Sequence, residues 1–289
     1  MSTMRILLLL ALLFSIAAAR AQPAIRVTQI AEVAEGLSQP HDAALSPDGR
    51  LLYVTDMRNS RMRVFSALTL KPVATFGEGE LSYPHDCEFD AAGRLLVADT
   101  GNDRIAIYDV KGPKPVLAGE LKGLSGPEGV AVAADGRVVV TNTRAGTLVV
   151  FRDGKPERTV GRHGTKAGEF ANPHDVEAAA DGSFHVVDSG NNRVQVLDAD
   201  LKPLSSSDAA LGLNGPKYLS FDAGTIWLAD EYNHRLLKFD RQYRLLGVLG
   251  AERGRAANRF HKPEAVIARA PHLWVIDTYN DRILLLRID

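Results

Sequence analysis

The sequence has few residues that could cross-link it and no excess of charge of one sign. Its 289 residues include one cysteine, Cys87, which excludes a disulfide within the chain and a cysteine-rich metal site. Basic and acidic residues number 34 and 35, so the chain has no general attraction for nucleic acid or for an anionic membrane. Hydrophobic residues make up 45%, which excludes intrinsic disorder.

Familiar catalytic motifs are absent as well. The sequence has no serine nucleophile elbow, no phosphate-binding glycine loop and no HExxH zinc motif. No segment beyond the first 21 residues has the apolar spacing of a helix. The function must therefore be inferred from other residues.

Long apolar runs are missing except at the N-terminus. Arg5 precedes an uncharged apolar run over residues 6–19, and Ala19-Arg20-Ala21 fits the small-residue rule for signal-peptide cleavage. This run is about 14 residues long, whereas about 20 are needed to span a bilayer. We predict a cleaved signal peptide over 1–21, no membrane span after cleavage, and a periplasmic or secreted protein that starts at Gln22.

The sequence does contain a repeat. Six copies of one pattern begin with a proline, continue through short runs rich in β-branched and aromatic residues, and include turns such as Asp-Gly and a polar hairpin with Asp, Asn and Arg. The prolines lie 43 to 47 residues apart, at Pro40, Pro84, Pro127, Pro173, Pro216 and Pro263. Four strands per copy predict an all-β, six-bladed β-propeller that forms a single domain over residues 22–289.

The two ends of the chain complement each other in this repeat. The sixth copy lacks a fourth strand, because the chain ends soon after the apolar segment 283–288. The segment 25–33 precedes the first copy and has the pattern of a strand. We predict that it completes the sixth blade, closes the ring and removes exposed sheet edges.

The copies resemble the NHL repeat. The fourth copy carries the resemblance best, in residues 168–176, 180–182 and 187–194, and the second copy is close to it at 99–105. The resemblance covers about residues 24 to 289 and implies a β-propeller fold. It leaves function open, because NHL-type propellers include enzymes, sensor domains, and protein- or RNA-binding scaffolds.

The residue after each proline is predicted to lie at one mouth of the central channel, since the innermost strands of a propeller surround that channel. These six residues are His41, His85, Glu128, His174, Lys217 and Glu264. Imidazole and carboxylate groups that converge on one axis suit a borderline metal ion. We predict a divalent metal, with zinc as first choice and calcium as second, and no organic cofactor. The predicted ligands are His41, His85, His174 and Glu264.

Residues beside this ring have predicted roles of their own. Asp42, Asp86 and Asp175 follow the three histidines and are expected to orient the imidazoles. Glu128, Lys217 and Tyr218 are expected to bind the ligand.

The Pro-His motifs also resemble those of the peptidyl-hydroxyglycine alpha-amidating lyases, which bind zinc through histidines from alternate blades. The match is partial, because Glu264 completes the alternate set that contains His85 and His174. The resemblance implies catalytic tyrosines and arginines near the mouth, and the matching positions here are Tyr232, Tyr279, Arg58 and Arg144.

Three classes of function remain open. We favour a module that binds a small molecule, peptide or protein at the channel mouth, as a monomer. The alternatives are an enzyme, either an amidating-type lyase or a lactonase-type hydrolase, and a scaffold without a function at the ring. The sequence alone does not decide whether the protein is an enzyme.

Other residues are predicted to be structural. Trp227 and Trp274 occupy equivalent places in two second strands and should fill the core between blades. Cys87 should pack as a small hydrophobic residue. The Asp, Asn and Arg of the hairpins should bind backbone groups in turns. Lys262 belongs to a charged loop that is expected to be solvated.

Overall fold

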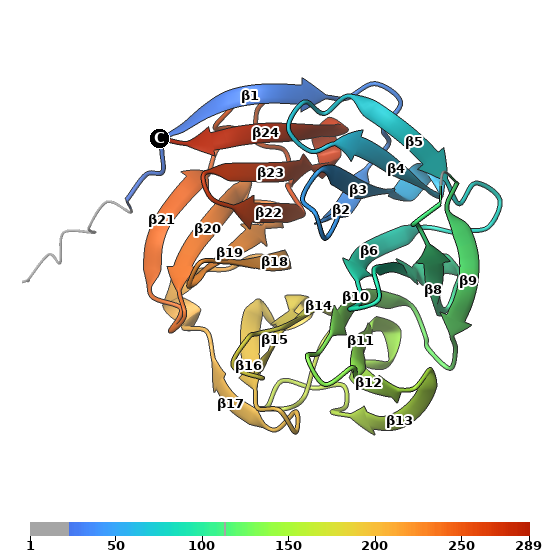
Figure 1. Cartoon of the computed structure of the whole chain (residues 1–289). Helices are drawn as coiled ribbons and strands as arrows, with labels where there is room; N and C mark the ends of the chain where they lie inside the picture. The colour runs from blue at the N-terminus through green and yellow to red at the C-terminus, as the bar shows by residue number, and fades with distance from the viewer. Residues whose placement is uncertain (1–22, 113) are drawn as a thin grey trace, which may run out of the picture.

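The computed structural model describes residues 23–112 and 114–289 (Figure 1). The predicted signal peptide over 1–21 and the predicted start at Gln22 lie outside these residues. Within the described part of the chain, we find no helix with the length and apolar character needed to cross a membrane.

Six four-stranded antiparallel sheets form blades around a central channel, as the repeat predicts (Figure 1). In blades 1 to 5 the strands follow the chain from the channel outward. Blade 1 contains β2 (Pro40–Leu45), β3 (Leu51–Asp56), β4 (Arg61–Ser66) and β5 (Pro72–Phe76). Blade 2 contains β6 (Pro84–Phe89), β7 (Arg94–Asp99), β8 (Arg104–Asp109) and β9 (Val116–Leu121). Blade 3 contains β10 (Pro127–Val132), β11 (Val138–Asn142), β12 (Thr147–Arg152) and β13 (Lys155–Val160).

The other three blades repeat this arrangement. Blade 4 contains β14 (Pro173–Ala178), β15 (Phe184–Asp188), β16 (Arg193–Leu197) and β17 (Pro203–Ser206). Blade 5 contains β18 (Pro216–Asp222), β19 (Thr225–Asp230), β20 (Arg235–Asp240) and β21 (Leu245–Gly250). Blade 6 contains β22 (Ala265–Arg269), β23 (His272–Asp277), β24 (Arg282–Ile288) and the N-terminal strand β1 (Val27–Val33).

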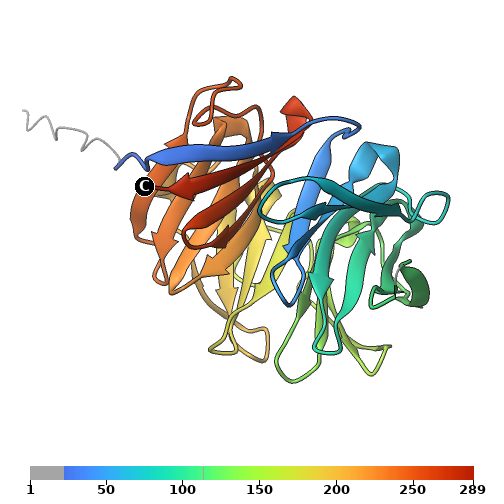
Figure 2. The same cartoon turned by 45° about the horizontal axis from the view of Figure 1, so that its top comes forward.

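The N-terminal strand closes the ring, which confirms the prediction. Strand β1 pairs antiparallel with β24, from Val27 opposite Ile288 to Val33 opposite Ile283. Figure 2 shows β1 lying along the outer edge of blade 6 beside the C-terminal strand. Blade 6 is therefore built from both ends of the chain, and β24 has a partner on each side.

A short 3-10 helix joins the second and third strands of every blade. These are η1 (Met57–Asn59), η2 (Thr100–Asn102), η3 (Thr143–Ala145), η4 (Ser189–Asn191), η6 (Glu231–Asn233) and η7 (Thr278–Asn280), while η5 (Ala209–Leu211) precedes β18.

The polar residues of these hairpins bind local backbone, as predicted. In blade 1, Asp56 Oδ1 accepts a hydrogen bond from Ser38 N at 2.8 Å, and Oδ2 accepts from Asn59 Nδ2 and Arg61 Nε at 2.9 and 2.8 Å. The same set surrounds Asp99, Asp188, Asp230 and Asp277. Each hairpin is thereby tied to the segment that leads into its own blade.

A left-handed residue turns the chain into every inner strand. The residue before each repeat proline has a φ between 44° and 59°, at Gln39, Tyr83, Gly126, Asn172, Gly215 and Lys262. In blades 1 to 5 the register between first and second strands then shifts directly after the proline. Such bulges re-aim side chains, and here they accompany the residues that face the channel mouth.

Hydrophobic clusters fill the spaces between neighbouring blades. Trp227 and Trp274 are 0% and 2% exposed in two of these clusters, which confirms that they are core residues. Cys87 is buried beside Tyr53, as expected for a small hydrophobic residue. Burial of this apolar surface stabilises the ring without a disulfide.

Candidate metal centre at the channel mouth

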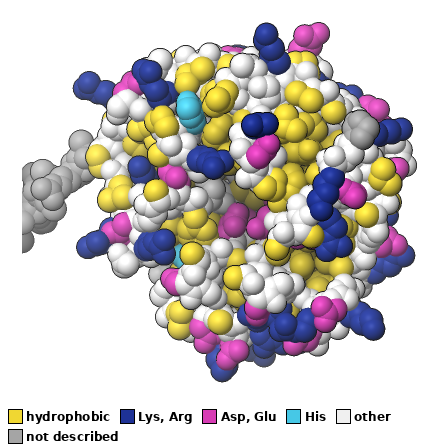
Figure 3. All heavy atoms as spheres, viewed as in Figure 1, with side chains coloured by type: hydrophobic (Ala, Val, Ile, Leu, Met, Phe, Trp, Pro, Cys, Tyr) yellow, Lys and Arg dark blue, Asp and Glu magenta, His cyan; other side chains and the backbone are white. Residues whose placement is uncertain are grey.

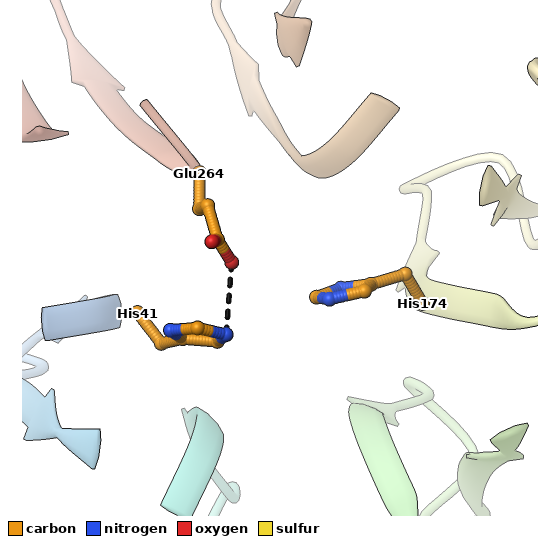
Figure 4. A group of neighbouring side chains, drawn as sticks. All are labelled: His41, His174 and Glu264. Carbon is orange, nitrogen blue, oxygen red and sulfur yellow. Dashed lines mark ion pairs between the residues drawn. The ribbon is translucent and has the colours of Figure 1, made fainter. Parts of the chain in front are cut away.

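Three of the ring residues converge at the channel mouth. His41 lies in β2, His174 in β14, and Glu264 immediately precedes β22. One ligand atom from each residue lies within 4.8 Å of the other two. His41 Nε2 is 2.9 Å from Glu264 Oε2, and His174 points toward this pair from across the channel (Figure 4). Two imidazoles and a carboxylate are the donor set of many catalytic zinc sites.

The three side chains are buried and incompletely hydrogen-bonded. They are between 2% and 7% exposed. Among the described residues, Nδ1 of His41, Nδ1 of His174 and Oε2 of Glu264 have no hydrogen-bond partner. The contact between His41 and Glu264 thus has the length of an ion pair without the alignment of a hydrogen bond. A buried polar atom without a partner lowers the stability of the fold. A cation bound among the three residues would provide a partner for those imidazole nitrogens and carboxylate oxygens that face it.

His85 lies next to this group but is not a member of it. Its ring centroid is 4.4 Å from that of His41, in an edge-on arrangement. Its Nδ1 lies 2.8 Å from the carbonyl oxygen of Tyr83. Burial, and after it the neighbouring His41, lowers the pKa of His85 to about 3, so this ring is neutral at pH 7.

The protonation states of the group suit metal binding. Burial lowers the pKa of His174 well below its usual value, and Lys217 and His85 add to the shift. Burial alone would raise the pKa of Glu264, but His41 and Lys217 outweigh burial and hold the pKa below its usual value. A neutral imidazole and an ionised carboxylate are the forms that ligate metals.

A pocket of about 440 Å³ opens beside the three residues. His174 belongs to both the pocket and the metal group. The pocket is also lined by Glu128, Arg144, Lys217 and Tyr232. Its volume is within the range of about 300–1,000 Å³ that is typical of small-molecule sites.

Two groups of opposite charge determine the electrostatics of this pocket. Burial raises the pKa of Glu128 to about 7, although Lys217 opposes the shift. Burial would lower the pKa of Lys217, but Glu264, Glu231 and Glu128 outweigh burial and raise the pKa. The pocket therefore presents a permanent cation and a carboxyl group that titrates near neutral pH.

The tyrosines predicted at the site occupy different depths. Tyr218 is buried, with its ring edge-on to His174 at 4.7 Å and its hydroxyl donating to the carbonyl oxygen of Glu128 at 3.2 Å. Tyr232 and Tyr279 are 51% and 38% exposed. Tyr232 lines the pocket, and Tyr279 is not among the residues that line it.

The two predicted arginines are held by exposed partners. Arg144 lines the pocket, and its Nη1 lies 2.9 Å from Asp103 Oδ1. Arg58 Nε donates to Gln39 Oε1 at 2.7 Å, and Arg58 is not among the pocket residues.

The aspartates do not orient the imidazoles, so that prediction is wrong. Asp86 Oδ2 accepts from the backbone N–H of Val130 at 2.6 Å, and Asp175 Oδ2 accepts from that of Leu219 at 2.9 Å. With Asp42 they line a cavity of about 160 Å³ one step deeper in the channel. The N–H groups that bind Asp86 and Asp175 belong to the inner strands of the following blades. Burial raises the pKa of Asp86 to about 6, and it also holds the pKa of Asp42 and of Asp175 well above the usual value of a carboxyl group.

Two charged residues at the mouth were missed by the sequence analysis. Glu231 is 2% exposed, and its carboxylate lies 3.6 Å from Lys217 Nζ and 3.4 Å from Lys262 Nζ. Lys262 Nζ also lies 4.3 and 4.5 Å from the ring centroids of Tyr232 and Tyr279. Lys262 is therefore part of the mouth and not of a solvated loop.

The repeat contained a signal for Glu231. It directly follows the hairpin aspartate of its blade. The equivalent residues of the other blades are uncharged: Met57, Thr100, Thr143, Ser189 and Thr278. A charged residue at a position that is otherwise neutral in every copy marks a local difference in function or in pairing.

Comparison with known proteins agrees with the repeat architecture. The sequence family described as the NHL repeat matches residues 37–65 and 124–151, in blades 1 and 3. The chain contains NHL repeats. No curated protein sequence shows a significant match to it.

The NHL-repeat propeller is similar to solved structures at low sequence identity. Virginiamycin B lyase from Staphylococcus aureus is 12% identical with a TM-score of 0.59, covering 87% of this chain and 81% of that chain. Streptogramin B lyase is 10% identical with a TM-score of 0.64, covering 92% and 98%. An auxiliary nutrient binding protein from Bacteroides ovatus is 13% identical with a TM-score of 0.68, covering 93% and 78%. At these identities the likeness concerns the fold alone.

Proposed function

We propose that this propeller binds a divalent metal ion at its channel mouth and uses that mouth to bind a small molecule or peptide. The observation that carries the proposal is the convergence of His41, His174 and Glu264 on one point. The three ligand atoms are no more than 4.8 Å apart, so each would need to move by less than about 1 Å to lie at the ~2.0–2.1 Å from a shared ion that zinc sites require. Small side-chain movements would complete a site with these three protein ligands, with His85 beside it.

The pocket beside the metal group supports a ligand as well as an ion. A metal held by three protein ligands keeps an open position for another donor. Since His174 borders the pocket, a ligand there would reach that position. Lys217 and Arg144 favour a ligand with an anionic group. A single subunit holds all of these residues, and we propose that the protein acts as a monomer.

Metal binding can be tested directly. Metal-free protein is titrated with zinc and calcium by calorimetry, and the metal content of freshly purified protein is measured. We expect one zinc per chain. The double change His41→Ala and His174→Ala should lower zinc affinity at least about 100-fold, because losing even a supporting contact costs about 10–100-fold. His163→Ala, an exposed histidine away from the ring, is the control. Absence of binding, or an equal loss in His163→Ala, would overturn the proposal.

A metal-dependent lyase is the second candidate. Two structures with similar folds are lyases by name, and Tyr232 and Lys217 lie in the pocket beside His174. A tyrosine or lysine near a metal can exchange a proton with a substrate. Release of glyoxylate from a peptidyl-hydroxyglycine tests the amidating-type reaction. Failure of the zinc-loaded protein to turn over this substrate would remove this candidate and leave the binding function intact. Two imidazoles also fit this class better than the carboxylate-rich calcium site of lactonases.

We further propose that the protein is exported to the periplasm or secreted. The apolar run and the Ala-Arg-Ala site before Gln22 support this.

A further inference from the structure

Repeated pairs of side chains fill the interfaces between blades. In each blade, the residue three places before the hairpin Asp or Asn belongs to the interface with the next blade. The residue four places before it belongs to the interface with the preceding blade. The resulting pairs are Tyr53 and Leu95, Leu96 and Val138, Val139 and Phe184, His185 and Ile226, Trp227 and Leu273, and Trp274 and Leu52.

One of these six pairs lacks a ring. All twelve residues belong to the described part of the chain, and five pairs include an aromatic or imidazole ring. The pair between blades 2 and 3, Leu96 and Val138, is aliphatic. The equivalent rings elsewhere are buried, as Trp227 at 0% and Trp274 at 2% exposure illustrate. Phe151 supplies a ring from another position, but the ring that the other five pairs carry at this place in the repeat is absent between blades 2 and 3.

An apolar pocket of about 590 Å³ lies at this interface. Leu96 and Val138 line it, together with Ile107, Val132 and Phe151. Ile107, Val132 and Val138 are partly exposed, although they pack against the buried cluster of this interface. Figure 3 shows hydrophobic side chains gathered in the groove between blade 2 and blade 3. The pocket is open to small molecules and lies between the turns at the channel end opposite the metal group.

The charges at the entrance indicate the polarity of an occupant. Three charged residues line the pocket: Asp90, Arg94 and Asp153. Arg94 Nε lies 2.7 Å from Asp90 Oδ2, so these two charges are paired. Within residues 23–112 and 114–289, Asp153 forms no ion pair. One negative charge is left at the entrance of an apolar pocket.

We propose that this pocket binds a small molecule that combines an aromatic ring with a cationic group. The ring occupies the volume that an indole or phenol side chain fills in other interfaces. The cation meets Asp153 at the entrance. This site shares no residue with the metal group and does not depend on the function proposed for the mouth.

Binding is tested with tryptamine, which carries an indole ring and an ammonium group, against indole-3-acetate, which has the same ring and the opposite charge. We expect tryptamine to bind the whole protein with a dissociation constant of about 1 mM or tighter, and indole-3-acetate at least about threefold more weakly. Leu96→Trp supplies the missing ring within the chain. It should weaken tryptamine binding at least about 10-fold while the melting temperature stays equal or rises. Leu96→Phe replaces it if the larger side chain prevents folding.

Further variants test whether tryptamine binds at this pocket and not at the channel mouth. Asp153→Asn should weaken tryptamine binding about two- to fivefold and leave indole-3-acetate unchanged, because the lost contact is an exposed charge. Asp200→Asn, in the corresponding outer turn of blade 4, is its control. His174→Ala should have no effect. The proposal is overturned if tryptamine does not bind, if a folded Leu96→Trp or Leu96→Phe protein binds it as the wild type does, or if His174→Ala abolishes binding.

Discussion

Single residues in this propeller differ widely in how much their replacement should lower the free energy of unfolding. Arg282 is 1% exposed, and its Nε lies 2.7 Å from the buried carboxylate of Asp277. Lys202 and Asp200 form a pair with side chains 73% and 69% exposed. The low dielectric around the first pair makes an unpaired charge there expensive, whereas solvent screens the second.

Replacing Arg282 with Met should therefore lower the free energy of unfolding by about 3–5 kcal/mol, because Asp277 would be left buried without its cation. Lys202→Ala should change it by less than about 1 kcal/mol. Urea unfolding followed by tryptophan fluorescence measures both. Similar losses in the two variants would contradict this account of the hairpin arginines.

A second residue should make stability depend on pH. Burial lowers the pKa of His185 to about 4, and its Nδ1 lies 2.7 Å from the hydroxyl of Tyr243. The folded protein keeps this ring neutral, while the unfolded chain takes up a proton below about pH 6.5. The contribution of His185 is thus present above pH 6.5 and is lost as the pH falls toward 4, by up to about 3 kcal/mol.

His185→Leu should be less stable than the wild type at pH 7, because the hydroxyl of Tyr243 loses its partner. The difference should narrow steadily between pH 6.5 and 4. Unfolding free energies of both proteins at several pH values test this. A difference that stays constant over this range would show that His185 does not titrate as described.

At the scale of elements, ring closure depends on one strand at the edge of blade 6. Without β1, strand β24 would become an open edge with unpaired backbone groups, which invites aggregation. The buried Leu284 and Leu286 would also be uncovered on that strand.

Deleting residues 23–33 should lower the melting temperature by more than about 10 °C and cause aggregation that increases with protein concentration. Ile30→Lys, a change at a side chain that is 46% exposed in the same strand, should shift the free energy of unfolding by less than about 0.5 kcal/mol. Calorimetry and light scattering measure both. A deletion variant that remains monomeric and equally stable would exclude a role for β1 in closure.

Most strands and turns could be predicted because each copy of the repeat contains residues that mark where its strands end. The proline, the Asp-Gly turn and the Asp-Asn-Arg hairpin mark strand ends by local chemistry, and local chemistry can be read from the chain. Blade 3 has Asn142 in place of the hairpin aspartate, yet Asn142 Oδ1 still accepts from Ser125 N at 2.5 Å. The element tolerates the change because one acceptor oxygen suffices for that bond.

For the whole molecule, our proposal of export leads to a test. Expressed with its full sequence in a bacterial host, the protein should be recovered from the periplasm or the medium with Gln22 as its first residue. N-terminal sequencing and intact mass measure the cleavage site. Because Cys87 is buried and is the single cysteine of the sequence, a reducing agent should leave the melting temperature unchanged. A protein that retains residues 1–21 would contradict the predicted leader.

The sequence by itself determined the number of blades, the closure of the ring and the ring of six residues at the channel mouth. These follow from spacing along the chain, which repeats in register six times. Only the tertiary structure decided which ring residues meet, because side chains from blades 1, 4 and 6 approach across the channel and not along the chain. It also left His85 beside His41 but outside the metal group, brought Glu231 between two lysines, and left one of the six interface pairs without a ring. Such outcomes depend on distances between blades, and no local pattern encodes those distances.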